Sequence, residues 1–236
     1  IVKLCQSSVD KFRGDYTVIR LDDTNLSEYL DIPDFVTNKR SNKNFGIAFY
    51  ADLIRIMLLH TYGGVWLDAT VLLTDRLPEK YTKPDLFMFQ RSGAAKNKLD
   101  WMAFNPTYFN WAKNSRINSL NSIIFAQKGN QTLAVMQDLL LDFWQTQDTI
   151  PHYFFFQILF DEIQKSNYAP NPYPAVDDTL PHLLQISWHK SVKDVNLADL
   201  FYQNQIHKLT YVPLGKSGTV SNAVEEWIVA NKPILD

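Results

Sequence analysis

One helix-to-strand segment constrains the fold of this chain more than any other feature. Residues 47–62 are rich in Leu, Ile and Met and predict a helix that is apolar on nearly every side, and therefore buried. Gly63-Gly64 predicts the end of this helix and a sharp turn, and Val65–Leu67 predicts a short strand that leads to Asp68. A buried helix followed by a buried strand is typical of α/β proteins.

Strand-like and helix-like segments alternate along the rest of the chain. We expect strands at 16–21, 65–67, 71–73, 85–90, 123–126, 187–189 and 208–212. Residues 91–100 predict a mobile polar loop, and the proline-rich stretch 168–182 predicts a long irregular connection. The alternation indicates an α/β sandwich with a largely parallel sheet, whose ligands bind beyond the carboxyl ends of the strands. A helical stripe over 1–12 opens the chain, so either a first strand is missing from it or the class is wrong.

Length, charge and cysteine content limit the class of protein. The 236 residues, 46% of them hydrophobic, suffice for one medium-sized domain with a sizeable core. A net charge of −2 argues against nucleic acid as the main partner, although it leaves room for a local basic patch. We expect no signal peptide and no spanning helix, because every apolar run is far shorter than about 20 residues. The single Cys5 permits no internal disulfide, which indicates a reducing, cytoplasmic setting.

Charged residues around the first segment are candidates for a site. Asp52 and Arg55 are three apart, so they lie on one helix face and can pair. The pair is either an ordinary surface ion pair or, on a buried helix, a charge that needs a partner or a ligand. Asp68 stands at a strand end, where function and structural capping are equally open interpretations.

The segment Ala51–Thr70, ADLIRIMLLHTYGGVWLDAT, resembles bacterial capsular polysaccharide synthesis glycosyltransferases and, more distantly, the DxD region of α-1,6-mannosyltransferase-like enzymes. The resemblance continues more weakly through 121–130, the helix around Trp144, 152–157 and 206–211. It implies the GT-A fold, a Rossmann-like mixed sheet flanked by helices, in one domain over 1–236. Residues 1–90 would then form the nucleotide-sugar half and 91–236 the acceptor side, with the family's first strand lying outside this chain.

The resemblance also implies roles for individual residues. It makes Asp68 the catalytic residue and, with His207, the ligand of Mn²⁺ or Mg²⁺, although the second acid of DxD is a hydroxyl in Asp68-Ala69-Thr70. We expect the donor to be bound by Asp52, Arg55, Gly63, Gly64, Asp68, Thr70 and Lys208. His152, Tyr153 and Gln157, which we expect on one face of a helix opening at Pro151, are assigned to the acceptor side. Ala51 replaces the serine of the family's Ser-Asp pair.

The implied activity is transfer of a sugar from a nucleotide diphosphate, a UDP-sugar, to a glycan acceptor during capsule or surface-glycan synthesis, with retention of configuration. The acceptor would be lipid-linked, so we expect peripheral contact at the inner membrane face. Two other classes stay open. One is a non-catalytic scaffold that binds sugar nucleotides or glycans. The other is a glycoside hydrolase using Asp68 with Asp177 or Asp161.

Overall fold

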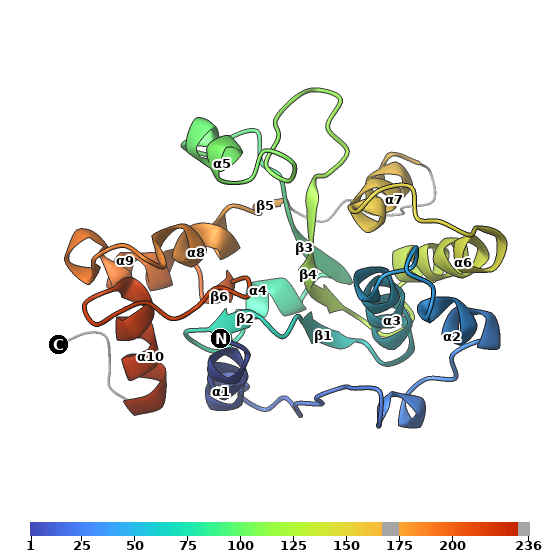
Figure 1. Cartoon of the computed structure of the whole chain (residues 1–236), viewed down its shortest axis with the longest axis horizontal. Helices are drawn as coiled ribbons and strands as arrows, with labels where there is room; N and C mark the ends of the chain where they lie inside the picture. Colours follow the sequence, from blue (N-terminus) through green and yellow to red (C-terminus); the bar gives the residue numbers. More distant parts are fainter. Residues whose placement is uncertain (167–174, 231–236) are drawn as a thin grey trace. The chain divides into compact units, whose positions relative to one another are not determined.

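The computed structural model describes residues 1–166 and 175–230 and divides into two compact units (Figure 1). Unit 1 is built from residues 1–19, 67–81 and the part from 177 onward. Unit 2 is built from residues 20–66 and 82–176. Each unit therefore gathers segments that lie far apart in the sequence.

Unit 2 holds the larger helices and most of the sheet. Its helices are η1 (Leu26–Glu28), α2 (Asp34–Arg40), α3 (Ile47–Tyr62), α5 (Lys98–Phe104), α6 (Gln131–Thr146) and α7 (Phe155–Lys165). Its strands are β3 (Leu86–Gln90) and β4 (Ser119–Ala126).

Unit 1 contains a two-stranded sheet surrounded by short helices. Its elements are α1 (Val2–Phe12), β2 (Val71–Leu73), η2 (Leu180–His182), α8 (Leu183–Ser187), η3 (Val192–Asp194), α9 (Leu197–Gln203), β6 (Ile206–Lys208) and α10 (Val220–Ala230). Three elements lie where the chain passes from one unit to the other, namely β1 (Gly64–Leu67), α4 (Glu79–Thr82) and β5 (Val176–Asp177).

The sheets have antiparallel ladders where their register is defined. The four-stranded sheet has the order β1-β4-β3-β5, and β3 pairs antiparallel with β4 from Leu86 opposite Ala126 to Gln90 opposite Ser119. In unit 1, β2 pairs antiparallel with β6. The expectation of a largely parallel sheet is therefore wrong for these pairs. The reason is that the chain reverses direction between these successive strands, and the one short helix between them, α5, does not serve as the crossover that a parallel pair requires. The mixed α/β architecture, with a sheet flanked by helices, is confirmed.

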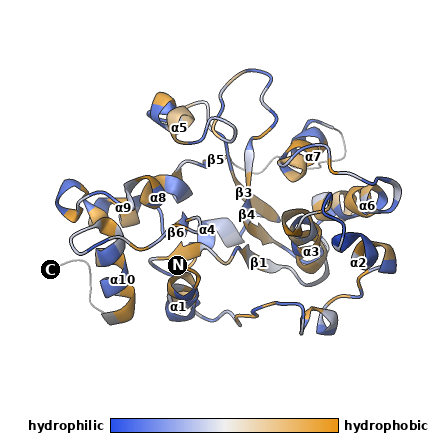
Figure 2. Ribbon diagram, viewed as in Figure 1, coloured by the Kyte–Doolittle hydropathy of each residue, from blue (hydrophilic) through white to orange (hydrophobic). Residues whose placement is uncertain are grey.

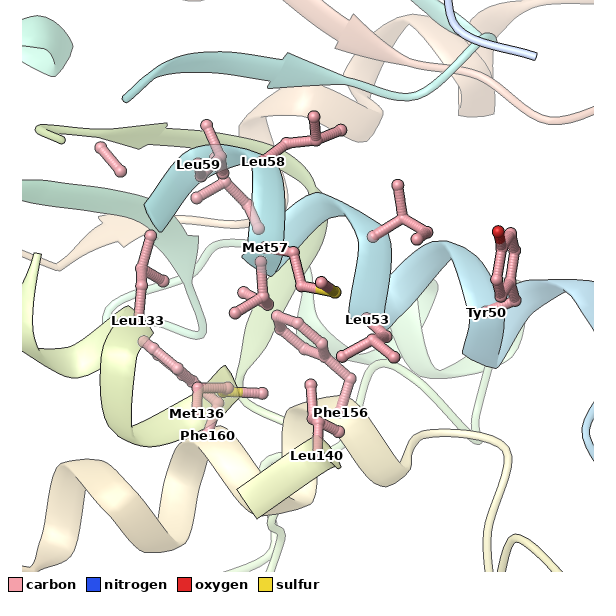
Figure 3. Close-up of a cluster of buried hydrophobic side chains, with 14 of the residues drawn as sticks. Tyr50, Leu53, Met57, Leu58, Leu59, Leu133, Met136, Leu140, Phe156 and Phe160 are labelled. Atoms are coloured by element: carbon pink, nitrogen blue, oxygen red, sulfur yellow. The ribbon is translucent and has the colours of Figure 1, made fainter. Parts of the chain in front are cut away.

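Unit 2 is organised around α3, as its apolar sequence predicts. Leu53 and Met57 of α3 face Leu140 of α6 and Phe156 of α7 in the cluster of Figure 3, and all four are buried. Hydrophobic colour is concentrated on α3, β3 and β4 in Figure 2, whereas α2 is mostly hydrophilic. Removing these surfaces from water is the main stabilising contribution to this unit.

Unit 1 has its own hydrophobic core. Leu4 and Cys5 of α1, Leu72 of β2, and Trp188 belong to one buried cluster with Val224 of α10. The Ser8 hydroxyl, also on α1, accepts a hydrogen bond from the Leu73 amide at 2.9 Å. These contacts join the first, middle and last segments of the chain into one packed body.

Two predicted strands are absent from the structure. Residues 16–21 form no strand, and Tyr16 and Ile19 are exposed, because no neighbouring strand supplies a ladder. Residues 187–189 form the end of helix α8 and the turn after it. Trp188 is buried, and its indole donates to the Pro213 carbonyl at 3.1 Å. The predicted strand 208–212 is displaced to 206–208.

The two predicted loops also need adjustment. The stretch 91–100 is not wholly a loop, because α5 begins at Lys98. Of the irregular stretch 168–182, residues 168–174 lie outside the described residues, and the remainder contains β5 and η2. Within residues 1–166 and 175–230, no helix is both long and apolar enough to cross a membrane.

Candidate functional site

Three of the predicted donor-binding residues come together in unit 1. Asp68 and Thr70 stand in the turn between β1 and β2, and Lys208 lies at the end of β6, opposite Val71. The Lys208 ammonium donates to the Thr70 hydroxyl at 2.7 Å and lies 3.4 Å from a carboxylate oxygen of Asp68. We call Asp68, Thr70 and Lys208 the Asp68 cluster.

The backbone holds the Asp68 cluster in place. The Val71 amide donates to the Asp68 carbonyl at 2.8 Å, which closes the turn. The Leu209 amide donates to the Thr70 carbonyl at 2.9 Å and ties the turn to the strand that carries Lys208. Two segments nearly 140 residues apart in sequence are thereby fixed against each other.

The Asp68 cluster is partly open to solvent. The side chains of Asp68 and Lys208 are 26% and 18% exposed, whereas Thr70 is buried. An ammonium group at such a position can bind a phosphate oxygen, and the carboxylate and hydroxyl can accept or donate hydrogen bonds to a sugar. The arrangement is therefore suited to a small anionic ligand with hydroxyl groups.

His207 lies apart from the Asp68 cluster. It precedes Lys208 in β6, so the two side chains point to opposite faces of the strand. The imidazole is fully buried, its Nε2 is 3.0 Å from the Thr74 hydroxyl, and burial lowers its pKa to about 3. Nδ1 has no hydrogen-bond partner. The structure therefore surrounds His207 with protein, on the strand face away from Lys208.

A complete metal site is not assembled by the described residues alone. No group of three or more His, Cys, Asp or Glu side chains among them is arranged to hold a metal ion. Asp68 is the one carboxylate in the Asp68 cluster, and its charge is already partly balanced by Lys208. A hard divalent cation prefers several anionic oxygens, so these residues do not fit a resident metal.

The second predicted pair, Asp52 and Arg55, is a buried network in unit 2. Asp52 and Arg55 are 6% and 5% exposed, and their charged atoms are 3.5 Å apart. Asn121 of β4 donates to the Asp52 carboxylate at 2.8 Å, and its carbonyl accepts from Arg55 at 2.5 Å. The guanidinium also lies over the Trp66 ring at 5.3 Å. The network joins helix α3 to β4 and to the strand that precedes Asp68.

Gly63 and Gly64 adopt backbone conformations that favour glycine. Their φ angles are +71° and +99°. A Cβ atom on Gly63 would lie 2.6 Å from the Lys128 amide nitrogen, whereas one on Gly64 would meet nothing within 4 Å. The close approach at Gly63 is thus to the chain's own backbone after β4, and Gly64 borders open space.

The three predicted acceptor-side residues do not share a helix face. Helix α7 begins at Phe155 rather than at Pro151, so His152 and Tyr153 precede it. The His152 Nδ1 atom accepts from the Phe154 amide, which makes a local turn in place of the first helical turn. Tyr153 is 69% exposed, whereas Gln157 is buried and its Oε1 has no hydrogen-bond partner.

The carboxylates considered for hydrolysis are occupied by structural bonds. Asp161 on α7 pairs with Arg116 and with Lys165, and it accepts from the Asn118 amide at 3.1 Å. Asp177 accepts from the Thr179 amide at 3.1 Å. These bonds give Asp161 and Asp177 structural roles.

Asn121 is a site residue that sequence reasoning missed. It carries the one amide side chain of strand β4, SLNSIIFA, whose other polar residues are two serines, and it bonds both members of the Asp52–Arg55 pair. An isolated amide inside an apolar strand is the signal that could have identified it, because a buried amide needs hydrogen-bond partners.

Fold and site together describe a mixed α/β protein whose Asp68 cluster combines a carboxylate, a hydroxyl and an ammonium group. A family model described as capsular polysaccharide synthesis protein matches residues 1–223. The chain belongs to this family, and a role in capsular polysaccharide synthesis follows from it. Comparisons with curated proteins and with solved structures found no match.

Proposed function

We propose that this chain is a glycosyltransferase of the GT-A type that moves a sugar from a nucleotide diphosphate donor, a UDP-sugar, to a lipid-linked glycan acceptor. The observation that carries the proposal is the Asp68 cluster, in which Lys208 stands beside both Asp68 and Thr70 at a partly open position. Membership of the capsular polysaccharide synthesis family supplies the biological setting.

The chemistry requires stabilisation of a departing diphosphate. In the proposed complex, the Lys208 ammonium exchanges its contact with Asp68 for a phosphate oxygen, because a phosphate group carries more negative charge than one carboxylate. Asp68 is then released to accept hydrogen bonds from the donor sugar. A preorganised charge aimed at the leaving group contributes most where the charge develops in the transition state.

The residues of the helix–turn–strand segment are assigned to support of the donor site. Asp52 and Arg55 hold α3 against β4, and Gly63 and Gly64 allow the turn into β1, which leads to Asp68. We assign His152, Tyr153 and Gln157 to the acceptor side. A Mn²⁺ or Mg²⁺ ion that accompanies the donor would be coordinated mainly by the phosphate oxygens of the donor and by water.

Donor turnover tests the proposal. Release of nucleoside diphosphate from a panel of nucleotide sugars is measured with and without Mn²⁺ for the wild type, Asp68→Asn and Lys208→Met. We expect turnover to fall about a thousandfold for Asp68→Asn and about a hundredfold for Lys208→Met, with melting temperatures close to that of the wild type. The exposed pair Asp194→Asn and Lys193→Met, also in unit 1, provides matched controls. Near-normal turnover by Asp68→Asn would make this residue a structural cap.

The alternative is a scaffold that binds sugar nucleotides or glycans without turnover. The single carboxylate of the Asp68 cluster and the Ala51 substitution favour it. Thermal stabilisation by a nucleotide sugar, lost in Lys208→Met, with no release of diphosphate over hours would support the scaffold. The anomeric configuration of the product, read by NMR, tests the proposed retention.

A further inference from the structure

The connection between β3 and β4, residues 91–118, is long and ordered. Hairpin loops usually contain about two to five residues, and much longer ones often carry function. In Figure 1, helix α5 lies beyond the ends of β3 and β4 within this connection. We call residues 91–118 the β3–β4 connection.

Arg91 fixes the β3–β4 connection from inside. Its guanidinium donates to the carbonyls of Tyr108 and Asn110 at 3.1 and 3.2 Å and lies 4.9 Å from the Trp111 ring centre. The Trp111 indole in turn donates to the Ser92 carbonyl at 2.7 Å. Any surface on this connection is therefore held in a defined shape before a partner arrives, which lowers the entropy lost on binding.

Helix α5 packs Trp101 inward and leaves other apolar side chains exposed to water. Trp101 is 3% exposed and contacts the Phe109 ring at 4.9 Å. Leu99 and Met102, three residues apart and hence neighbours on the helix surface, are 80% and 37% exposed. Phe104 at the end of α5 is 43% exposed, although its ring also contacts the rings of Trp101 and Phe109. A scattered exposed Leu needs no explanation, but the neighbouring pair Leu99 and Met102, together with the exposed part of Phe104, indicates an interaction surface.

The charge of the β3–β4 connection differs from that of the whole chain. It carries five basic residues and one acid, Asp100, whereas the whole chain has a net charge of −2. Arg91 bonds within the connection and Arg116 pairs with Asp161 and Glu162, so the three lysines carry the excess charge. Lys96 and Lys113 are exposed, and Lys98 bonds the Gly93 carbonyl and lies 5.8 Å from the Trp111 ring centre. Elements that lie in a membrane interface typically combine exposed apolar side chains, aromatic rings and lysines.

We propose that the β3–β4 connection docks on the surface of an anionic lipid bilayer. Leu99, Met102 and Phe104 would enter the boundary between headgroups and acyl chains, while Lys96 and Lys113 bind lipid phosphates. A water-filled groove in a partner protein would not require this combination of protruding apolar side chains and excess positive charge. The inference concerns a different surface from the Asp68 cluster and does not depend on transferase activity.

Flotation with vesicles tests the docking directly. The full chain is mixed with vesicles of phosphatidylcholine alone or with vesicles that also contain about 30% phosphatidylglycerol. The second composition imitates the anionic lipid content of a natural membrane. We expect binding to the anionic vesicles only. Lys96→Gln/Lys113→Gln should weaken it about thirtyfold, and Leu99→Ser/Met102→Ser about tenfold or more. The controls Lys43→Gln/Lys128→Gln and Leu139→Ser change exposed residues elsewhere in unit 2 and should bind like the wild type.

A fluorescent label distinguishes insertion from loose electrostatic attraction. An environment-sensitive dye on Leu99→Cys should shift to shorter wavelength with anionic vesicles, and the same dye on Leu139→Cys should not. Cys5 does not interfere, because it is buried and its pKa is raised to about 12, which keeps the thiol protonated and unreactive. Absence of flotation, equal flotation by all variants, or self-association that Leu99→Ser/Met102→Ser abolishes would each overturn the proposal.

Discussion

Lys208 places one positive charge beside the carboxylate of Asp68 and the hydroxyl of Thr70. Its contact with Thr70 is shorter than its contact with Asp68, at 2.7 against 3.4 Å. The Thr70 hydroxyl thus gives the lysine an uncharged partner in the same turn. Under the proposed function this favours binding of an anionic donor by Lys208, because less of the lysine's charge is neutralised in advance.

The Asp52–Arg55 pair differs from a surface ion pair because both charges are buried. Removing Arg55 as Arg55→Ala leaves Asp52 without its counter-ion, and we expect the free energy of unfolding to fall by about 3–5 kcal/mol. Arg40→Ala, which removes the partner of exposed Asp23, should cost less than about 1 kcal/mol. Urea unfolding of both variants makes the comparison. Equal midpoints would show that the Asp52–Arg55 network contributes little.

Residue types were easier to predict than side-chain directions. The sequence led to Asp68, Thr70 and Lys208, which the structure brings together, and to the Asp52–Arg55 pair, which it confirms. It did not separate His207 from Lys208, because it placed the strand at 208–212. Both residues lie in β6, where successive side chains alternate, and the bounds of β6 follow from its register with β2. That register depends on pairing between segments far apart in the chain, which no local pattern encodes.

At the scale of elements, the turn after α3 depends on Gly63. We expect Gly63→Ala to destabilise the protein by more than about 1 kcal/mol, because φ is +71° and the new Cβ would lie 2.6 Å from a backbone nitrogen. Gly93→Ala, where φ is ordinary and no atom lies within 4 Å, is the matched control in unit 2 and should be nearly neutral. Thermal unfolding of the two variants measures the difference. A neutral Gly63→Ala would mean that β1 and the Lys128 backbone can separate without cost.

Helices were predicted better than strands for a physical reason. A helix such as α3 satisfies its own backbone and can be recognised from a local stripe of apolar residues. A strand needs a partner, so the β-branched run at 16–21 forms none, and the antiparallel order of β3 and β4 depends on where the chain returns. The late start of α7 reflects His152, whose ring bonds the Phe154 amide and competes with the first helical turn.

At the scale of the whole molecule, His207 makes stability depend on pH. Burial lowers its pKa from 6.5 to about 3 in the folded state. Between these values the unfolded chain binds a proton that the folded chain excludes, so stability is full above about pH 6.5 and falls as the pH drops towards 3. The loss approaches about 1.4 kcal/mol per pH unit for this one group.

Replacement of His207 isolates this contribution from that of the carboxylates. We expect the stability of His207→Gln to change less than that of the wild type between pH 6.5 and 4.5, as measured by urea midpoints at several pH values. His189→Gln changes an exposed histidine of the same unit and should follow the wild type. Parallel curves for the wild type and His207→Gln would contradict the assignment.

The division into two units was not visible in the sequence. The chain passes between the units after residues 19, 66, 81 and 176, and only the last of these places falls within the proline-rich stretch 168–182. Composition marks a boundary only where a flexible segment separates two bodies. Three of the passages fall at β1, α4 and β5, in or beside regular elements, and the passage after residue 19 lies in the irregular segment between α1 and η1.

The interleaving of the segments has a consequence for biosynthesis. Strand β2 leaves the ribosome with Val71, Leu72 and Leu73, all of which are buried in the folded protein, but its partner β6 is made nearly 140 residues later. Because synthesis adds about 5–20 residues per second, roughly 7–28 s pass before the strand that pairs with β2 has been made. Unit 2 has by then been synthesised in full. Unit 1 therefore begins to emerge first but can complete its fold only after unit 2. Its early segments are the ones that require protection from aggregation during translation.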